Sequence, residues 1–138
     1  MMVEYELTDK PDGELDEHIR VKTREYNAQF TPPEFQYLSI YCRDDDGKIV
    51  GGLTAKTYWD YFDIEFLWVD ERVRRKGVAS KVIAMGEAEA KRRGCTYAQL
   101  DTFEFQALGF YKKAGYELFG TLEGYCGKYQ RYYLKKAL

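Results

Sequence analysis

The sequence predicts an α+β domain, a sheet of about seven strands covered by helices, and three observations lead to this fold class. Its 138 residues are 45% hydrophobic, which is enough to bury the core of one domain. Residues 64–69 are apolar and β-prone apart from one glutamate, and a short basic loop and a stretch with helical spacing follow them. Residues 44–47, Asp-Asp-Asp-Gly, separate two β-prone segments as the turn of a hairpin does.

The first half of the chain predicts one strand, one helix and then two strands. Residues 1–8 alternate weakly between apolar and polar side chains, which favours a first strand. A helical face follows before Pro32-Pro33, which ends the helix. This face carries Leu15, Ile19, Lys22, Tyr26 and Phe30. Residues 36–43 and 48–59 are the two strands of the hairpin.

The second half repeats the alternation of strands and helices. A strand over residues 95–102 is followed by a helix between Phe103 and Gly115, where the glycine is typical of a helix end. Strands over residues 116–122 and 128–134 complete the chain. The predicted order of elements is therefore β-α-β-β-β-α-β-α-β-β.

Composition and charge exclude several classes of protein. The net charge of −2 argues against a dedicated nucleic-acid binder. No apolar run approaches the roughly 18 residues of a membrane span, and no signal sequence precedes Val3. Cys42, Cys95 and Cys126 lack the spacing of a metal site, and His18, the single histidine, lies on a charged helix face. These features predict a reduced, cytoplasmic protein with no metal and no histidine-activated nucleophile.

The loop before residue 78 has the features of an anion-binding site. After it, apolar residues recur at helical spacing at Val78, Val82, Met85, Gly86 and Ala90. The start of a helix presents unpaired N–H groups and the positive end of the helix dipole, and Gly77 lets the backbone approach a phosphate closely. Neither G-x-x-x-x-G-K-[ST] nor G-x-G-x-x-G occurs, so the common nucleotide motifs are absent. The alternative interpretation is a solvated turn that happens to contain a glycine.

Two carboxylates in the strand before this loop are candidates for a general base. With a period of two, Asp63 and Glu65 share one strand face with Leu67 and Val69. The opposite face then carries the core side chains Phe62, Ile64, Phe66 and Trp68. Such carboxylates can remove a proton from an ammonium substrate, directly or through water. They can also be part of a solvent-facing stretch with no catalytic role.

Two motifs resemble those of the GNAT superfamily of acyl-CoA-dependent N-acetyltransferases. Arg74-x-x-Gly77-x-Ala79 resembles the R/Q-x-x-G-x-G/A signature, and it lies between a strand and an amphipathic helix as in that family. Ala107-x-x-Phe110-Tyr111-x-x-x-Gly115-Tyr116 resembles the stretch that follows the cofactor loop. The C-terminal stretch is also similar to a small uncharacterised bacterial branch. The resemblance implies a single GNAT-like domain over residues 1–138, with a mixed, mostly antiparallel sheet.

The resemblance also implies acetyl-CoA as acyl donor and assigns its contacts. The strand before the loop splays from its neighbour around the pantetheine arm, which the amides of Leu67 and Val69 contact. The pyrophosphate lies on the loop formed by Arg74, Arg75, Lys76, Gly77, Val78, Ala79 and Ser80. Tyr111 lies beside the sulfur. Many family members carry asparagine where this chain has Glu104, so the resemblance does not imply a cofactor contact from that position.

The chemistry of these residues fits transfer of an acetyl group to a primary amine. An amine of pKa near 10 must lose a proton before it attacks, and Glu65, then Asp63, or a water chain is the expected base. A strand amide polarises the carbonyl, and the Tyr111 phenol can protonate the departing thiolate. Asp63, Glu65, Asp101 and Glu104 predict a negative cleft and a cationic small-molecule acceptor. The alternative function is a non-catalytic acyl-CoA sensor or regulatory module; no nucleic acid or membrane partner is expected, and a homodimer is compatible with the sequence.

Overall fold

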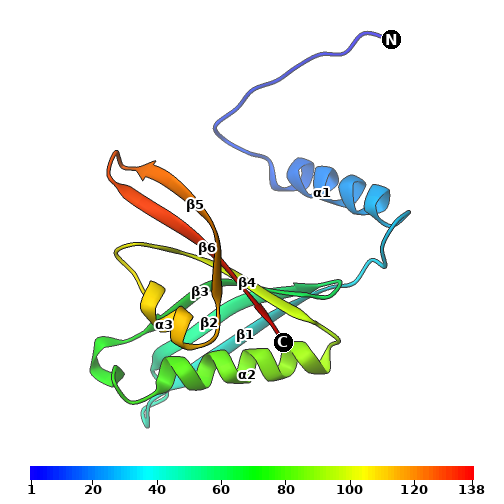
Figure 1. Ribbon diagram of the computed structural model, residues 1–138. Coiled ribbons are helices and arrows are strands. Elements are labelled where there is room, and N and C mark those ends of the chain that lie inside the picture. Colours follow the sequence, from blue (N-terminus) through cyan, green and yellow to red (C-terminus); the bar gives the residue numbers. More distant parts are fainter. The chain divides into compact units, whose positions relative to one another are not determined.

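A six-stranded mixed sheet organises residues 34–138 in the computed structural model, which describes all 138 residues (Figure 1). The strands are β1 (Phe35–Arg43), β2 (Ile49–Tyr58), β3 (Tyr61–Val69), β4 (Tyr97–Phe103), β5 (Glu117–Tyr125) and β6 (Tyr129–Ala137). Their order across the sheet is β1-β2-β3-β4-β6-β5. Every neighbouring pair is antiparallel except β3 and β4, which run parallel. The predicted class, a mostly antiparallel mixed sheet with helices, is confirmed.

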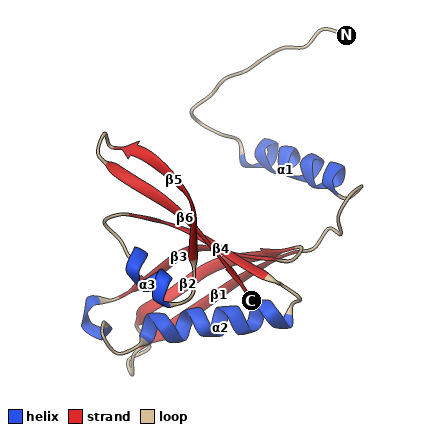
Figure 2. Cartoon of the chain, viewed as in Figure 1, coloured by secondary structure: helices blue, strands red, loops and turns tan.

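Two helices cover one face of this sheet, with the hydrophobic core between them and the strands (Figure 2). They are α2 (Val78–Arg92) and α3 (Leu108–Lys113), and a short 3₁₀ turn, η1 (Glu71–Val73), precedes α2. Helix α2 contacts β1, β2 and β3. Phe62, Leu53, Leu134 and Val82 are the largest fully buried side chains, and they come from three strands and α2. None of the helices is long and apolar enough to cross a membrane.

A partly buried polar cluster attaches α2 to β6 and to the residue that precedes β5. The Tyr116 hydroxyl donates a 2.8 Å hydrogen bond to the Glu87 carboxylate of α2. The ammonium group of Lys136, on β6, donates to the same carboxylate at 2.9 and 3.0 Å. Burial, together with the negative charge of Glu87, raises the pKa of Tyr116. Each member of the cluster is satisfied by the others, as a buried network requires.

The N-terminal unit, residues 1–33, contains one helix and no strand. The predicted helix is confirmed as α1 (Gly13–Asn27), and the Asp12 carboxylate caps it by accepting bonds from two backbone N–H groups. The first strand predicted over residues 1–8 is wrong. This stretch has no regular secondary structure, because alternation alone makes no strand without a neighbour to pair with its backbone. The sheet therefore has six strands and not about seven.

The predicted pattern of faces along β3 is also wrong beyond Ile64. Ala55 pairs with Ile64 but Thr54 pairs with Phe66, so Glu65 is an extra residue, a β-bulge. The bulge reverses the alternation. Phe62 and Ile64 are 0% and 4% exposed under α2, whereas Phe66 and Trp68 are 74% and 51% exposed on the opposite face.

The helix predicted between Phe103 and Gly115 is shorter in the structure, where α3 begins at Leu108. The preceding residues form a turn because the Gln106 side-chain oxygen accepts a 2.7 Å bond from the Phe103 backbone N–H. The Thr102 hydroxyl donates to the same oxygen at 3.2 Å. These bonds close the end of β4 before the helix can start.

The contact between α2 and the sheet leaves no space at Gly86. A Cβ atom at this position would lie 2.8 Å from the ring of Phe62, which is fully buried. We expect Gly86→Val to lower the free energy of unfolding by about 2 kcal/mol through overpacking. Ala84→Val, at an exposed position of the same helix, is the matched control for the helix propensity of valine. Urea denaturation measures both, and equal effects of the two substitutions would contradict the tight contact.

Candidate functional site

A cleft opens where β3 and β4 separate. The two strands pair only through Tyr61–Asp63 and Tyr97–Gln99, and beyond these residues no ladder joins them. The resulting cleft has a volume of about 480 Å³. Its walls are residues 64–69 of β3, residues 100–102 of β4, and side chains of α3 and its preceding turn.

The loop that precedes α2 is held in an unusual backbone conformation. Gly77 has a φ of 74°, and Arg75 has a φ of 65°, which is costly for a residue with a side chain. No side chain caps the start of α2, so its first backbone N–H groups point out of the helix without a capping partner. Such donors, at the positive end of a helix dipole, form a site for an anion.

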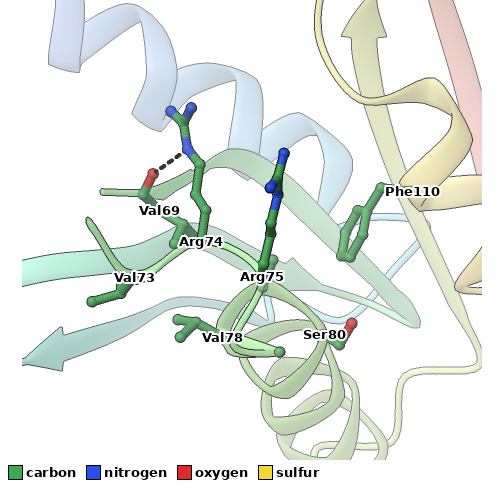
Figure 3. Close-up of a pocket in the computed structure, with 9 residues that line it drawn as sticks. Val69, Val73, Arg74, Arg75, Val78, Ser80 and Phe110 are labelled. Carbon is green, nitrogen blue, oxygen red and sulfur yellow. Dashed lines mark hydrogen bonds between the residues drawn. The ribbon is translucent and has the colours of Figure 1, made fainter. Parts of the chain in front are cut away.

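A hollow of about 220 Å³ lies over these N–H groups (Figure 3). Figure 3 shows the Arg74 and Arg75 side chains extending in the same direction from the loop, with Phe110 of α3 beyond them. The Arg74 Nε donates a 3.2 Å bond to the Val69 carbonyl, which fixes this guanidinium at the end of β3. Four residues line both the hollow and the cleft, so the two cavities are continuous. They are Val69, Arg74, Ala79 and Phe110.

The other two basic residues of the loop, Arg72 and Lys76, do not line the hollow. Arg72 makes two bonds to the Asp70 carboxylate, at 3.0 and 3.1 Å. These bonds, with one from the Arg72 backbone N–H, lower the pKa of Asp70 to about 2. Arg72 therefore stabilises η1, and Lys76 is not among the residues that line the hollow. Arg75, Gly77, Val78, Ala79 and Ser80 all line it, and these are among the residues that the resemblance assigns to the pyrophosphate.

Tyr111 lies in the wall of the cleft. It belongs to α3, its ring packs against Phe110 and Tyr116, and only 8% of the residue is exposed. No buried side-chain oxygen or nitrogen lacks a partner, and no protein group bonds the Tyr111 hydroxyl, so this hydroxyl faces the open space of the cleft. Burial, and to a smaller extent the charge of Asp101, raises the pKa of Tyr111 above its usual value of 10.

The two candidate bases on β3 lie in different environments, because the bulge at Glu65 changes the face on which the following residues lie. Glu65 lines the cleft, whereas Asp63 does not. Asp63 accepts a 3.2 Å bond from the Gln99 side chain, and burial raises its pKa. The Lys56 ammonium lies 3.7 Å from Asp63 and 3.5 Å from Glu65. Glu65 is thus the better-placed carboxylate.

The other two predicted carboxylates have partners of their own. Asp101 lines the cleft but accepts a 3.0 Å bond from Arg131, and this guanidinium also lies over the rings of Phe103, Tyr125 and Tyr133. Glu104 accepts a 3.0 Å bond from the Gln130 backbone N–H, close to the turn of the β5–β6 hairpin. The cleft is therefore less negative than the carboxylates alone predict.

Aromatic side chains in the cleft were not predicted as part of the site. Phe66, Trp68 and Phe105 line it together with Glu65 and Asp101. The sequence does contain a signal for Phe105, because this residue lies two positions before the motif that begins at Ala107. The bulge that turns Phe66 and Trp68 away from the core has no signal in the sequence. No group of His, Cys, Asp and Glu side chains in the chain could hold a metal ion.

The chain matches the model of the acetyltransferase (GNAT) family over residues 1–116. An acetyltransferase of Agrobacterium fabrum is 36% identical over 119 residues, which cover 86% of this chain and 87% of that protein. The blasticidin-S acetyltransferase of Streptomyces morookaense is 35% identical over 91 residues, 65% of this chain and 67% of that protein. The crystal structure of an acetyltransferase from Agrobacterium tumefaciens is 31% identical, with a TM-score of 0.90, and the match covers 99% of this chain and all of that one.

Proposed function

Because the chain belongs to the GNAT family of acetyltransferases, we propose that it transfers the acetyl group of acetyl-CoA to a primary amine of a small cationic acceptor. The observation that carries this proposal is the continuous passage from the anion-binding hollow to the cleft beside Tyr111. A cofactor with a phosphate at one end and a reactive thioester at the other needs a passage of this kind.

The proposed cofactor contacts follow the passage. The pyrophosphate lies on the N–H groups from Gly77 to Ser80, and Arg74 and Arg75 neutralise its charge. The pantetheine arm then enters the gap between β3 and β4, where the backbone of Leu67 and Val69 borders the cleft. The acetyl group comes to lie near Tyr111. Lys76, which does not line the hollow, contributes at most a general positive field.

The proposed reaction is direct attack of the amine on the thioester carbonyl. A C–N bond forms, the C–S bond breaks, and the proton lost by the ammonium group passes to Glu65 or to water. A β3 amide stabilises the oxyanion. The Tyr111 phenol donates a proton to the thiolate of CoA, and the second proton, which the nitrogen loses as the amide forms, returns to the phenol directly or through water. Because its pKa is raised, this phenol stays protonated throughout the pH range in which the amine becomes neutral.

The proposed acceptor is an amine with a positive charge and an apolar or planar part. Glu65 attracts the charge, and Phe66, Trp68 and Phe105 offer faces on which a cation or a ring can lie. A relative is named for blasticidin S, so this compound belongs in the first set of acceptors to test. Release of free CoA thiol, measured against blasticidin S, aminoglycosides, polyamines and N-terminal peptides, tests the function. Binding of acetyl-CoA without turnover of any amine would instead support a sensor.

Gly77 provides the first test of the cofactor site. Gly77→Val adds a side chain where the phosphate approaches, and it strains a backbone with positive φ. We expect acetyl-CoA affinity to fall about 100-fold in calorimetry, as the loss of one or two charge-assisted hydrogen bonds would give. Gly94→Val is the matched control, since Gly94 has a φ of 92° at the other end of α2 with open space around it. Equal losses of affinity in both variants would argue against a phosphate site at Gly77.

Tyr111 provides a test of the proposed general acid, the group that protonates the CoA thiolate. Tyr111→Phe keeps the packed ring and removes the hydroxyl, so we expect turnover to fall about 100-fold, with acetyl-CoA affinity unchanged. In the wild type, the raised pKa places any loss of activity from deprotonation of this phenol above pH 10. Tyr116→Phe, which also deletes a buried phenol, should lower stability and leave turnover intact. A Tyr111→Phe enzyme as fast as the wild type between about pH 7 and 9 assigns the proton to water.

The two carboxylates of β3 can be distinguished by amide substitutions. We expect Glu65→Gln to reduce turnover about 100-fold near pH 7, and less near pH 9, where more of the amine is neutral without help. Asp63→Asn, outside the cleft and equally close to Lys56, should have little effect on turnover. If Asp63→Asn proves the slower enzyme, or neither substitution changes the pH profile, Glu65 is not the base.

A further inference from the structure

The Gln106 side chain is held in the wall of the cleft by its own oxygen atom. The Phe103 backbone N–H donates to Oε1 at 2.7 Å, and the Thr102 hydroxyl donates to the same atom at 3.2 Å. A backbone N–H requires an acceptor, so the bonded atom is the oxygen and the other end of the amide is Nε2. Because both donors hold Oε1, the direction in which the Nε2 N–H groups point is fixed as well.

These bonds place the Gln106 amide at the edge of β4 that faces the gap. Successive backbone N–H groups along a strand point to opposite edges. The Glu104 N–H, just after β4, bonds the Gln130 carbonyl of β6 at 3.0 Å. The preceding N–H, that of Phe103, therefore points to the other edge, and β3 lies on that side of β4. Gln106 thus lies at the point where β4 has lost its strand partner.

Gln106 carries the one unused side-chain N–H donor in the segment of the wall that joins β4 to α3. The side chains of this segment that line the cleft are Leu100, Asp101, Thr102, Phe105, Gln106 and Ala107. The leucine, the phenylalanine and the alanine are apolar, Asp101 accepts from Arg131, and the Thr102 hydroxyl already donates to Gln106. The Gln106 Nε2 has no acceptor within the protein. Its N–H groups are therefore available to a molecule in the cleft.

An N–H donor at this point complements a carbonyl oxygen. The pantetheine arm proposed for the gap carries amide groups between the pyrophosphate and the sulfur, and an amide carbonyl that leaves water needs a donor. Backbone groups of β3 border one side of the gap. On the β4 side, the Phe103 N–H is already bonded to Gln106. The carboxamide thus occupies one backbone donor and supplies side-chain donors at the same edge.

We infer that Gln106 binds the cofactor, with Nε2 donating a hydrogen bond to an amide carbonyl of the pantetheine arm. Gln106 precedes α3, which carries Phe110 at the junction of the hollow and the cleft. The bond holds the middle of the arm, while the loop before α2 holds the pyrophosphate and Tyr111 lies beside the acetyl group. This role rests on the cofactor site of the proposed function and is independent of the acceptor.

Gln106→Glu tests the bond, because it separates the donor from the turn that the same side chain closes. A carboxylate still accepts from Phe103 and Thr102, so we expect the urea midpoint of the wild type. It has no N–H, and its oxygen would face the carbonyl of the arm. We therefore expect the affinities for CoA and for acetyl-CoA, measured by calorimetry, to fall together by about tenfold. Unchanged affinities would overturn the inference, as would a loss for acetyl-CoA alone, since the bond would then go to the acetyl group.

Two controls separate this bond from charge and from stability. ADP carries a pyrophosphate but no pantetheine arm, so the Gln106→Glu protein should bind ADP as tightly as the wild type does. An equal loss for ADP would indicate repulsion between the new carboxylate and the phosphates, and would overturn the inference. Thr102→Val removes a buried hydroxyl and keeps Nε2. It should lower the urea midpoint and leave CoA affinity unchanged, because the 2.7 Å bond from Phe103 still holds the amide.

Nuclear magnetic resonance of the wild type provides a test that needs no substitution. In isotope-labelled protein, the side-chain amide signals of Gln106 should shift when CoA is added and stay in place when ADP is added. The Gln99 side chain is the matched control, since its Nε2 already donates to Asp63 at 3.2 Å and lies outside the cleft. Its signals should not move with either ligand. Binding of CoA that leaves the Gln106 signals in place would contradict the proposed contact.

The Gln106 contact and the proposed function fail separately. A wild type that binds neither CoA nor acetyl-CoA removes the proposed cofactor site and this contact with it. A wild type that binds both, together with a Gln106→Glu variant that binds them equally tightly, removes only the contact and leaves the proposed function intact. A loss of affinity for CoA but not for ADP, in a protein that acetylates no amine of the panel, supports the contact and removes the proposed acceptor instead.

Discussion

Strands β3 and β4 are hydrogen-bonded over three residue pairs and then part, and the candidate site depends on this limited contact. Parallel strands that stayed paired to their ends would leave no space between Glu65–Val69 and Leu100–Phe103. The bulge at Glu65 helps to separate them, since an extra residue bends a strand and increases its twist. On the other side, β4 ends at Phe103 and the chain turns into α3. The cleft thus results from backbone geometry. Its side chains line a space that exists because the hydrogen bonds between β3 and β4 stop after three residue pairs.

The phosphate loop is positioned by the same strand. Val69 ends β3 and accepts a bond from Arg74, and the Asp70 N–H bonds the Val50 carbonyl on β2, so the chain leaves the sheet in a fixed direction. Asp70 then holds Arg72 and orders η1. Beyond the loop, α2 is attached to the sheet through Glu87, Tyr116 and Lys136. The strand before the loop and the helix after it are therefore held in place, which is what a pre-organised binding site requires.

The sequence was sufficient to predict the elements whose signals are local. The hairpin turn at Asp44–Gly47, the amphipathic α2 and the glycine loop before it depend on residues close together in the chain. The faces of β3 could not be predicted, because the bulge at Glu65 arises from the register with β2, where Ala55 pairs with Ile64 but Thr54 pairs with Phe66. The same limit applies to Asp101 and Arg131, which are 30 positions apart and neutralise one another only in the fold. The error over residues 1–8 has a related cause, since a strand exists only where a second strand pairs with it.

The left-handed backbone of Arg75 has a consequence for attempts to engineer this protein. A non-glycine residue in that conformation costs about 1 kcal/mol, and glycine or asparagine would relieve it. A library selected only for heat resistance would therefore favour replacement of Arg75, and would discard a positive charge beside the anion-binding hollow without any sign of damage. Selection for stability and selection for use of the site act in opposite directions at this one position. Stabilised variants should accordingly be sought with Arg75 held constant.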